Sequence, residues 1–308
     1  MYDLIPSSPE GFLVISHIMT MQSNGIIRIA VQRSGRLSEG SLNLLRSMGL
    51  QFETYQNRLF TTCRNMPVDI LSLRDDDIPE YVQDGIADLG IVGSNLLDEN
   101  SATVERLLPL DFGYCTLALA VPEQNSIQSV CGLSGKKIAT SYPNTLKRYL
   151  AQKEINAEVI VLRGCVEIAP ALRIADAICD LVSTGSTLRT NRLRILETVS
   201  RNQAVLIRTP RPSPAKQKII GKLLLRASGV REARVFKYIM FNLPARKLKD
   251  VKTLVPGCDS PTVMPLADPQ MIAVHSVVEE ERFWEVVERI KECGGSGILV
   301  TPIEKFIR

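Results

Sequence analysis

The chain has 308 residues, of which 45% are hydrophobic and 23% charged. These values are typical of globular proteins and exclude a disordered chain or a coiled-coil rod, and the length allows two or three domains. The formal net charge of +4 and the aromatic content of 5% argue against nucleic acid as a partner. They suit a protein that binds an anionic small molecule.

The seven cysteines are scattered and form no CxxC motif, which predicts a reducing, cytoplasmic setting without a disulfide framework or a zinc site. No apolar run approaches 18 residues, so no membrane association is expected. Residues 1–24 carry neither a basic segment before the short apolar run at 11–15 nor an A-x-A site after it, and we interpret them as a mobile tail. A partner-binding arm is the alternative interpretation.

In the first part of the chain, β-rich runs predict strands at residues 26–31, 68–73 and 89–92. A helix is expected from Ser38, which can cap it, to Gly49, which ends it, and a second helix after Pro79. Strands that alternate with helices in this way are typical of a parallel α/β sheet.

The alternation continues beyond residue 113, with predicted strands at 114–121, 136–140, 159–162 and 178–182 and a helix around Leu146. An internal repeat is visible here: residues 85–93 (GIADLGIVG) resemble residues 173–182 (RIADAICDLV). The repeat predicts two similar lobes that share a cleft at the carboxyl ends of their strands. We expect one lobe at residues 25–112 and 200–226 and the other at 113–199.

The end of the chain reads as a separate domain at residues 227–308, which follows a proline-rich segment at 208–214 and a basic helix at 216–226. Its expected order is strand 236–243, helix 245–254, strands 262–266 and 271–278, helix 279–293 and strand 298–301. This βαββαβ order is the ferredoxin-like split pattern.

The segment with the clearest chemistry is residues 180–188, DLVSTGSTL. A predicted strand ends in Asp180, and small hydroxyl residues surround Gly185, so backbone N–H groups and hydroxyls could cradle a phosphate at the start of a helix. An ordinary strand-to-helix turn with a Ser/Thr cap is the alternative. Because a carboxylate repels a phosphate, Asp180 would need ribose hydroxyls or Mg²⁺ between the two groups.

Other charged residues lie at predicted strand ends. Asp75, Asp76 and Asp77 could bind Mg²⁺ or simply form an acidic first helical turn. Three arginines at strand ends, Arg33, Arg36 and Arg74, are candidate anion ligands. Asp88 and Asp176 precede strands, where the residues by themselves favour local turn capping.

Several segments then occur together in one order: residues 27–38 (IRIAVQRSGRLS), 66–79 (MPVDILSLRDDDIP), 87–93 (ADLGIVG), 136–143 (KKIATSYP), 176–188 (DAICDLVSTGSTL) and 256–268 (PGCDSPTVMPLAD). In these segments the sequence resembles the long, single-chain form of the ATP phosphoribosyltransferase family, whose reaction begins histidine biosynthesis. The resemblance covers about residues 26–308, and DLVSTGSTL matches the family's signature for phosphoribosyl pyrophosphate (PRPP).

The resemblance implies that N1 of ATP is joined to the ribose C1 of PRPP with release of pyrophosphate and with Mg²⁺ as cofactor. It implies a two-lobed core like that of type II periplasmic binding proteins, an ACT-like regulatory domain, and a homohexamer built from dimers and inhibited by histidine. The implied catalytic residues are Asp180 and Arg33. The implied PRPP ligands are Asp176, Asp180, Ser183, Thr184, Gly185, Ser186 and Thr187. The implied ATP ligands are Arg33, Gly35, Arg36, Arg74, Asp88, Gly90, Ser141 and Tyr142. Histidine would bind Asn242, Cys258, Ser260 and Thr262, and the metal would bind Asp180 and Asp75.

The sequence departs from the family pattern at two informative positions. Arg33 stands where relatives often carry Lys, and Arg173 stands where they usually carry Gly. A solute-binding protein would share the two-lobed architecture, but an export signal is missing and the phosphate loop is unexplained by that function. A ligand-sensing regulator would need a DNA-binding helix pair, and the sequence has no such segment.

Overall fold

The computed structural model describes residues 25–53, 59–255, 257 and 260–308. The predicted tail at 1–24 and the predicted effector ligand Cys258 lie outside the described residues. The chain divides into two compact units, one with residues up to 43 and 50–219 and one with residues 44–49 and 220–308. Among the residues described, no helix has the length and apolar character needed to cross a membrane.

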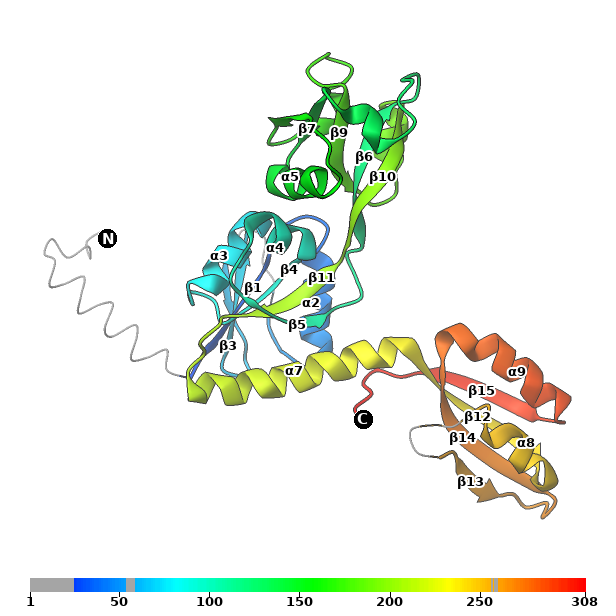
Figure 1. The fold of residues 1–308 in the computed structure, drawn as a ribbon. Coiled ribbons are helices and arrows are strands. Elements are labelled where there is room, and N and C mark those ends of the chain that lie inside the picture. The colour runs from blue at the N-terminus through cyan, green and yellow to red at the C-terminus, as the bar shows by residue number, and fades with distance from the viewer. Residues whose placement is uncertain (1–24, 54–58, 256, 258–259) are drawn as a thin grey trace, which may run out of the picture. The chain divides into compact units, whose positions relative to one another are not determined.

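The first unit contains two sheets (Figure 1). The first has the order β2-β3-β1-β4-β11-β5 and is built from β1 (Ile27–Gln32), β2 (Phe60–Thr62), β3 (Val68–Leu73), β4 (Leu89–Gly93), β5 (Glu105–Pro109) and β11 (Ala204–Arg208). Its helical elements are α2 (Ser38–Ser47), the 3₁₀ turn η1 (Asp75–Asp77), α3 (Ile78–Gln83) and α4 (Ser94–Asn100). All five residues of β4 are buried, as expected of a central strand that is covered on both faces.

The second sheet has the order β10-β6-β9-β7-β8. Its strands are β6 (Cys115–Pro122), β7 (Lys137–Thr140), β8 (Glu158–Val161), β9 (Ala177–Val182) and β10 (Leu193–Asn202). The helical elements are η2 (Val130–Leu133), α5 (Pro143–Gln152), η3 (Val166–Ile168) and α6 (Ser186–Thr190). Strands β8, β7 and β9 pair in parallel, β6 pairs antiparallel with β9, and β10 pairs antiparallel with β6. The first sheet has the same pattern: β3, β1 and β4 pair in parallel, β11 pairs antiparallel with β4, and β5 pairs antiparallel with β11.

The prediction of two similar lobes is therefore confirmed. The predicted parallel pairing holds for β3, β1 and β4 and for β8, β7 and β9, whereas β11, β5, β6 and β10 pair antiparallel with their neighbours. The chain passes between the lobes twice, from β5 to β6 and from β10 to β11 (Figure 1). A strand that enters a lobe in this way joins the sheet in the reverse direction, next to β4 or β9. Sequence patterns do not distinguish such a strand from a parallel one, because both are buried apolar runs.

The internal repeat has a structural cause. In the first lobe the Asp88 carboxylate accepts a hydrogen bond from the Arg28 N–H at 2.9 Å, and the Asp88 N–H donates to the Arg28 carbonyl at 2.9 Å. Asp176 makes the same two bonds with Lys137, at 2.9 and 2.8 Å. Each Ile-Ala-Asp turn thus ties the amino end of a strand to its parallel neighbour.

The second unit carries a four-stranded antiparallel sheet of order β13-β14-β12-β15. Its elements are β12 (Phe236–Pro244), α8 (Leu248–Lys252), β13 (Thr262–Pro265), β14 (Met271–Glu279), α9 (Phe283–Glu292) and β15 (Ser296–Pro302). Alternate residues of β12 (Ile239, Phe241 and Leu243) are buried in one core with Val251 of α8 and Ile290 of α9. This arrangement confirms the predicted ferredoxin-like βαββαβ domain. The preceding helix α7 (Pro214–Val235) is longer than predicted.

Candidate active site

The predicted phosphate loop lies at the carboxyl end of β9. Gly185, with φ of +73°, is the residue before α6, and this left-handed conformation is one that glycine adopts without steric cost. The hydroxyls of Thr184 and Ser186 lie 3.0 Å apart. Residues 180–188 and Glu167 line one cavity of about 310 Å³. The structure therefore brings together every predicted PRPP ligand except Asp176.

Two carboxylates line this cavity. Asp180 accepts one hydrogen bond from the Leu181 N–H at 2.8 Å. Burial raises the pKa of Asp180, and the charge of Glu167 raises it further, whereas the bond from Leu181 lowers it. Sequence reasoning missed Glu167, because no motif surrounds it. The lobe symmetry is the signal that would have found it, since η3 follows β8 as the acidic turn η1 follows β3.

A larger cavity of about 910 Å³ is lined by residues of both lobes. Predicted ATP ligands among them are Arg74, Ser141 and Tyr142, and the acidic residues Asp75 and Asp76 also line it. Asp75 and Asp180 line different cavities, so the structure does not place the two predicted metal ligands in one cavity.

Tyr142 lies at the centre of the site. Its ring packs against the hydrophobic cores of both lobes, and its hydroxyl lies 3.5 Å from the Asn95 side-chain nitrogen. Burial raises the pKa of Tyr142, and the charges of Asp180, Asp75 and Asp76 raise it further. The carboxylates at the ends of β3 and β9 thus act on the same hydroxyl.

The loop after β1 is held by Gln32, a residue that the sequence analysis did not identify. Its side-chain nitrogen donates to Asp75 at 3.1 Å, and its oxygen accepts from the Leu37 N–H at 2.9 Å. Gly35 has φ of +114°, and a Cβ there would lie 2.7 Å from the Gln32 nitrogen. Glycine suits position 35 because L side chains rarely adopt this positive φ, and a Cβ there would also displace the Gln32 side chain. A polar residue directly after the apolar run Ile29–Val31 was the available signal.

The predicted ATP ligands Arg36, Asp88 and Gly90 make contacts elsewhere in the structure. The Arg36 guanidinium donates to the Gly113 carbonyl at 2.6 Å, at the first passage between the lobes. Asp88 and Gly90 lie at the amino end of β4, away from the cleft end of the strand. Asp88 is ion-paired with Lys216 at 2.9 Å, and a Cβ at Gly90 would lie within 3.1 Å of the side chains of α3 and β11. Asp88 and Gly90 are buried and engaged in these contacts, so their positions do not support the ATP-binding roles assigned to them. Asp176 is engaged with Lys137 in the same way, so its position does not support its PRPP-binding role.

The described residues contain no group of three or more His, Cys, Asp or Glu side chains placed to hold a metal ion. In the C-terminal domain, Asn242 pairs with Ala273 and Thr262 pairs with His275 in the sheet. These two predicted effector ligands therefore share the sheet face opposite the helices, with β14 between them, and Ser260 is exposed just before β13.

Comparison with known proteins agrees with this architecture. The family model described as ATP phosphoribosyltransferase matches residues 74–229, and the one described as HisG, C-terminal domain, matches residues 233–305. An ATP phosphoribosyltransferase of Cytophaga hutchinsonii is 45% identical over 283 residues, which are 92% of this chain and 99% of that one.

Among solved structures, the ATP phosphoribosyl transferase (HisG:HisZ) complex from Thermotoga maritima matches with a TM-score of 0.58 and 27% identity. The match covers 66% of this chain and 96% of that one. With a catalytic core and a C-terminal domain that each match their own family model, the chain belongs to the ATP phosphoribosyltransferase family of transferases, in its long form.

Proposed function

We propose that this enzyme transfers the phosphoribosyl group of PRPP to N1 of ATP, as the first step of histidine biosynthesis. The bond from ribose C1 to the pyrophosphate oxygen breaks, a bond from C1 to N1 forms, and pyrophosphate leaves. The observation that carries the proposal is the loop at 183–187, whose hydroxyl residues line one cavity together with Asp180 and Glu167.

PRPP binds in this cavity. The 5′-phosphate is held by backbone N–H groups and by the hydroxyls of Ser183, Thr184, Ser186 and Thr187, since successive N–H groups in such a turn attract anions. The carboxylates of Asp180 and Glu167 accept hydrogen bonds from the ribose hydroxyls, which lie between them and the phosphate. This arrangement removes the repulsion that direct contact between carboxylate and phosphate would cause.

ATP binds in the larger cavity between the lobes, with Arg74 and Arg33 as ligands of its phosphates. Arg74 lines that cavity with Ser141 and Tyr142. A tyrosine hydroxyl is protonated at physiological pH, and burial raises the pKa of Tyr142 further, so this group can donate a hydrogen bond to a substrate. Gly35 and Arg36 shape the neighbouring loop through their contacts with Gln32 and Gly113.

The donor set fits Mg²⁺. Asp180 and Glu167 line one cavity, and the charge of Glu167 raises the pKa of Asp180, which is the repulsion that a bound cation relieves. Mg²⁺ is commonly held by one or two carboxylates together with substrate phosphates and water. We infer that these two carboxylates hold it, and that the ion when bound neutralises charge on the leaving pyrophosphate.

The protein accelerates the reaction by position and charge. The ribose gains positive charge at C1 as the pyrophosphate leaves, and carboxylates near the ribose stabilise that charge. Arg33 and Arg74 stabilise the negative charge of the phosphates. The two lobes hold N1 of ATP against C1 of the ribose, so that a bimolecular reaction proceeds as a unimolecular step within the complex.

The C-terminal domain is the site of feedback inhibition in this proposal. Histidine binds at Asn242, Ser260 and Thr262, where hydroxyl and amide groups can hold a carboxylate and an amine. Inhibition then acts through the arrangement of a homohexamer built from dimers. The setting is the cytoplasm, which would keep reduced the six free cysteines that lie within the described residues.

The test is a pyrophosphate-release assay with the full chain, ATP, PRPP and MgCl₂. Release should require all three additions, and the other product should be ATP that carries a phosphoribosyl group at N1, identified by mass and ultraviolet spectrum. Histidine should slow the reaction. If PRPP is hydrolysed without ATP, or if no pyrophosphate is released, the proposed reaction is wrong.

A further inference from the structure

The two lobes of the catalytic unit are joined by a contact between α4 and α5. Helix α5 of the second lobe has no side-chain cap of its own at its first turn, where Tyr142 precedes Pro143. The N–H groups of the first turn of a helix have no partner inside the helix and need one elsewhere. In α5 that partner comes from the other lobe.

The partner is Glu99, in the last turn of α4. One oxygen of its carboxylate accepts from the Asn144 N–H at 2.9 Å, and the other accepts from the Thr145 N–H at 2.8 Å. The Asn144 side chain donates to the Glu99 carbonyl at 3.2 Å. Glu99 is only 7% exposed, and its two hydrogen bonds satisfy N–H groups of the first turn of α5.

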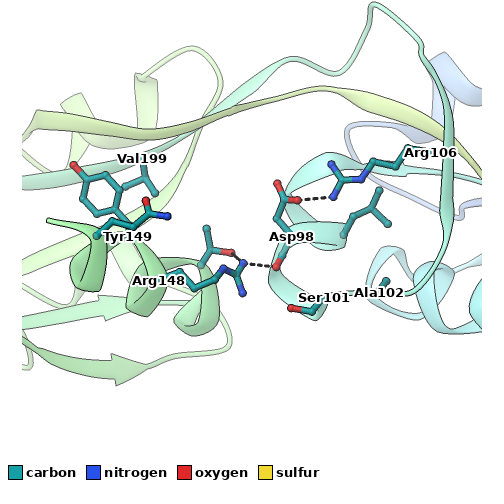
Figure 2. A pocket seen from close by; sticks show the side chains of 10 residues that line it. Asp98, Ser101, Ala102, Arg106, Arg148, Tyr149 and Val199 are labelled. Atoms are coloured by element: carbon teal, nitrogen blue, oxygen red, sulfur yellow. Dashed lines mark hydrogen bonds and ion pairs between the residues drawn. The ribbon is translucent and has the colours of Figure 1, made fainter.

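A second contact lies beside the first. Arg148, one turn further along α5, donates to the Asp98 carbonyl, and the Asp98 carboxylate is ion-paired with Arg106 of its own lobe. Figure 2 shows the contacts among Arg148, Asp98 and Arg106, with Arg148 reaching from the second lobe to Asp98 near the end of α4. The interaction with Arg148 uses the backbone of Asp98, so it does not depend on the aspartate side chain.

The position of this contact relates it to catalysis. Glu99 lines the cavity of about 910 Å³ together with Tyr142 and Arg74. Asp98 and Arg148 line a different cavity of about 530 Å³. The α4–α5 contact therefore lies between the cavity of about 910 Å³ and the cavity of about 530 Å³, and it joins residues of the two lobes.

We propose that Glu99 is a positioning residue, which fixes the orientation of the two lobes and so aligns the substrate held by one with the substrate held by the other. This inference rests on the proposed function, in which PRPP binds to the second lobe and ATP binds between the lobes. Glu99 touches no reacting atom, and its effect on the reaction passes through the Asn144 and Thr145 N–H groups.

The variant Glu99→Gln tests this role with little change in size. Glutamine has one acceptor oxygen and places an NH₂ group against a backbone N–H, so the charge and one hydrogen bond are lost. The kcat should fall by about tenfold to a hundredfold, because a small misplacement of reactants has effects of that order. The Kd of PRPP, measured by calorimetry without ATP, should stay within about twofold, since the phosphate loop is not altered.

Hydrogen–deuterium exchange supplies a readout that does not depend on activity. A peptide that covers residues 141–148 should exchange faster in Glu99→Gln than in the parent, because two protected N–H groups lose their partner. Asp98→Asn is the matched control, since it removes a charge from the adjacent position but keeps the carbonyl that Arg148 uses, and it should leave exchange and kcat unchanged. Asn144→Ala changes the contact from the second lobe, because it removes the side-chain hydrogen bond to the Glu99 carbonyl. It should also speed exchange and lower kcat, but by smaller amounts than Glu99→Gln.

The outcomes separate the hypotheses. If exchange is unchanged in Glu99→Gln, the contact does not join the lobes and the inference is wrong. If exchange is faster but kcat is unchanged, the contact stabilises the protein without aligning substrates, and the positioning role is wrong. If the parent itself releases no pyrophosphate, the proposed function fails, while the exchange comparison still decides whether Glu99 joins the lobes.

Discussion

Asp88 and Asp176 make the same backbone hydrogen bonds in the two lobes but should differ greatly in their effect on stability. Asp88 is 3% exposed, and both of its carboxylate oxygens contact the Lys216 ammonium, at 2.9 and 3.0 Å. Asp176 is only partly buried, and its side-chain oxygen accepts from the Lys137 N–H. Replacing each aspartate with asparagine keeps the acceptor for the backbone N–H and removes the charge.

The expected magnitudes follow from burial. Removing one member of a buried ion pair costs about 3–5 kcal/mol, because the other charge is left buried without a partner. The Lys216 side chain retains 18% exposure, so we expect the low end, about 3 kcal/mol, for Asp88→Asn. Asp176→Asn weakens a single hydrogen bond to a charged group and should cost about 1 kcal/mol.

The assay is thermal and urea unfolding of both variants at one pH and salt concentration. For a unit of this size, the Tm should fall by about 6–12 °C in Asp88→Asn and by about 2–4 °C in Asp176→Asn. The double variant Asp88→Asn, Lys216→Met should recover most of the loss, since no unpaired charge remains. Equal losses in the two single variants would refute the reasoning, as would a double variant that is no more stable than Asp88→Asn.

Four further predictions concern the loops and the effector site. Gly185→Val should abolish pyrophosphate release with the circular dichroism spectrum unchanged, because valine resists a φ of +73°; near-normal turnover would remove the loop from the PRPP site. Asp180→Asn should weaken PRPP binding in calorimetry by about tenfold or more, yet raise the Tm at neutral pH. The pKa of this buried carboxyl is raised in the folded protein, so its ionisation lowers stability as pH rises above the pKa that the carboxyl has in the unfolded chain. A lower Tm in Asp180→Asn, together with an equal loss of ATP affinity, would indicate misfolding. Arg173→Gly should raise the free energy of urea unfolding by about 1 kcal/mol, since Arg173 has φ of +58°, and a decrease would show that its side chain makes compensating contacts. Ser260→Ala with Thr262→Ala should raise the histidine concentration for half-inhibition about tenfold without changing uninhibited turnover; an unchanged value would place the effector site elsewhere.

Residues that act within one segment could be predicted from the sequence. The loop at 183–187, with glycine in the middle of small hydroxyl residues, is readable because the backbone conformation and the donors are local. The same holds for the two Ile-Ala-Asp turns, although their partners Arg28 and Lys137 were not predicted. The departure at Arg173 was also visible, and the structure gives that residue the left-handed conformation that favours glycine.

Residues that act across segments were not predicted. Glu167 and Glu99 stand outside the segments that carry the resemblance, and Gln32 lies in one of them without a role of its own. They become significant only because η3 lies beside the β9 loop, α4 meets the first turn of α5, and the ends of β1 and β3 are adjacent. Conversely, Asp88 and Gly90 match the family's segment, yet they lie at the amino end of β4 and are engaged in an ion pair and in packing.

By itself, therefore, the sequence predicted the strands β1, β3, β4, β6, β7, β8 and β9, the two similar lobes, the ferredoxin-like order of the last domain and the chemical character of the phosphate loop, because hydrophobic period, turn residues and local donors are properties of short segments. It did not predict β2, β5, β10 or β11. Only the tertiary structure decided the direction of β5, β6, β10 and β11 and the contact between α4 and α5. The two passages of the chain between the lobes bring β6 and β11 into their sheets antiparallel to β9 and β4. Strand pairing and burial depend on which distant segments meet, and the free energy that selects them comes from the whole packed core.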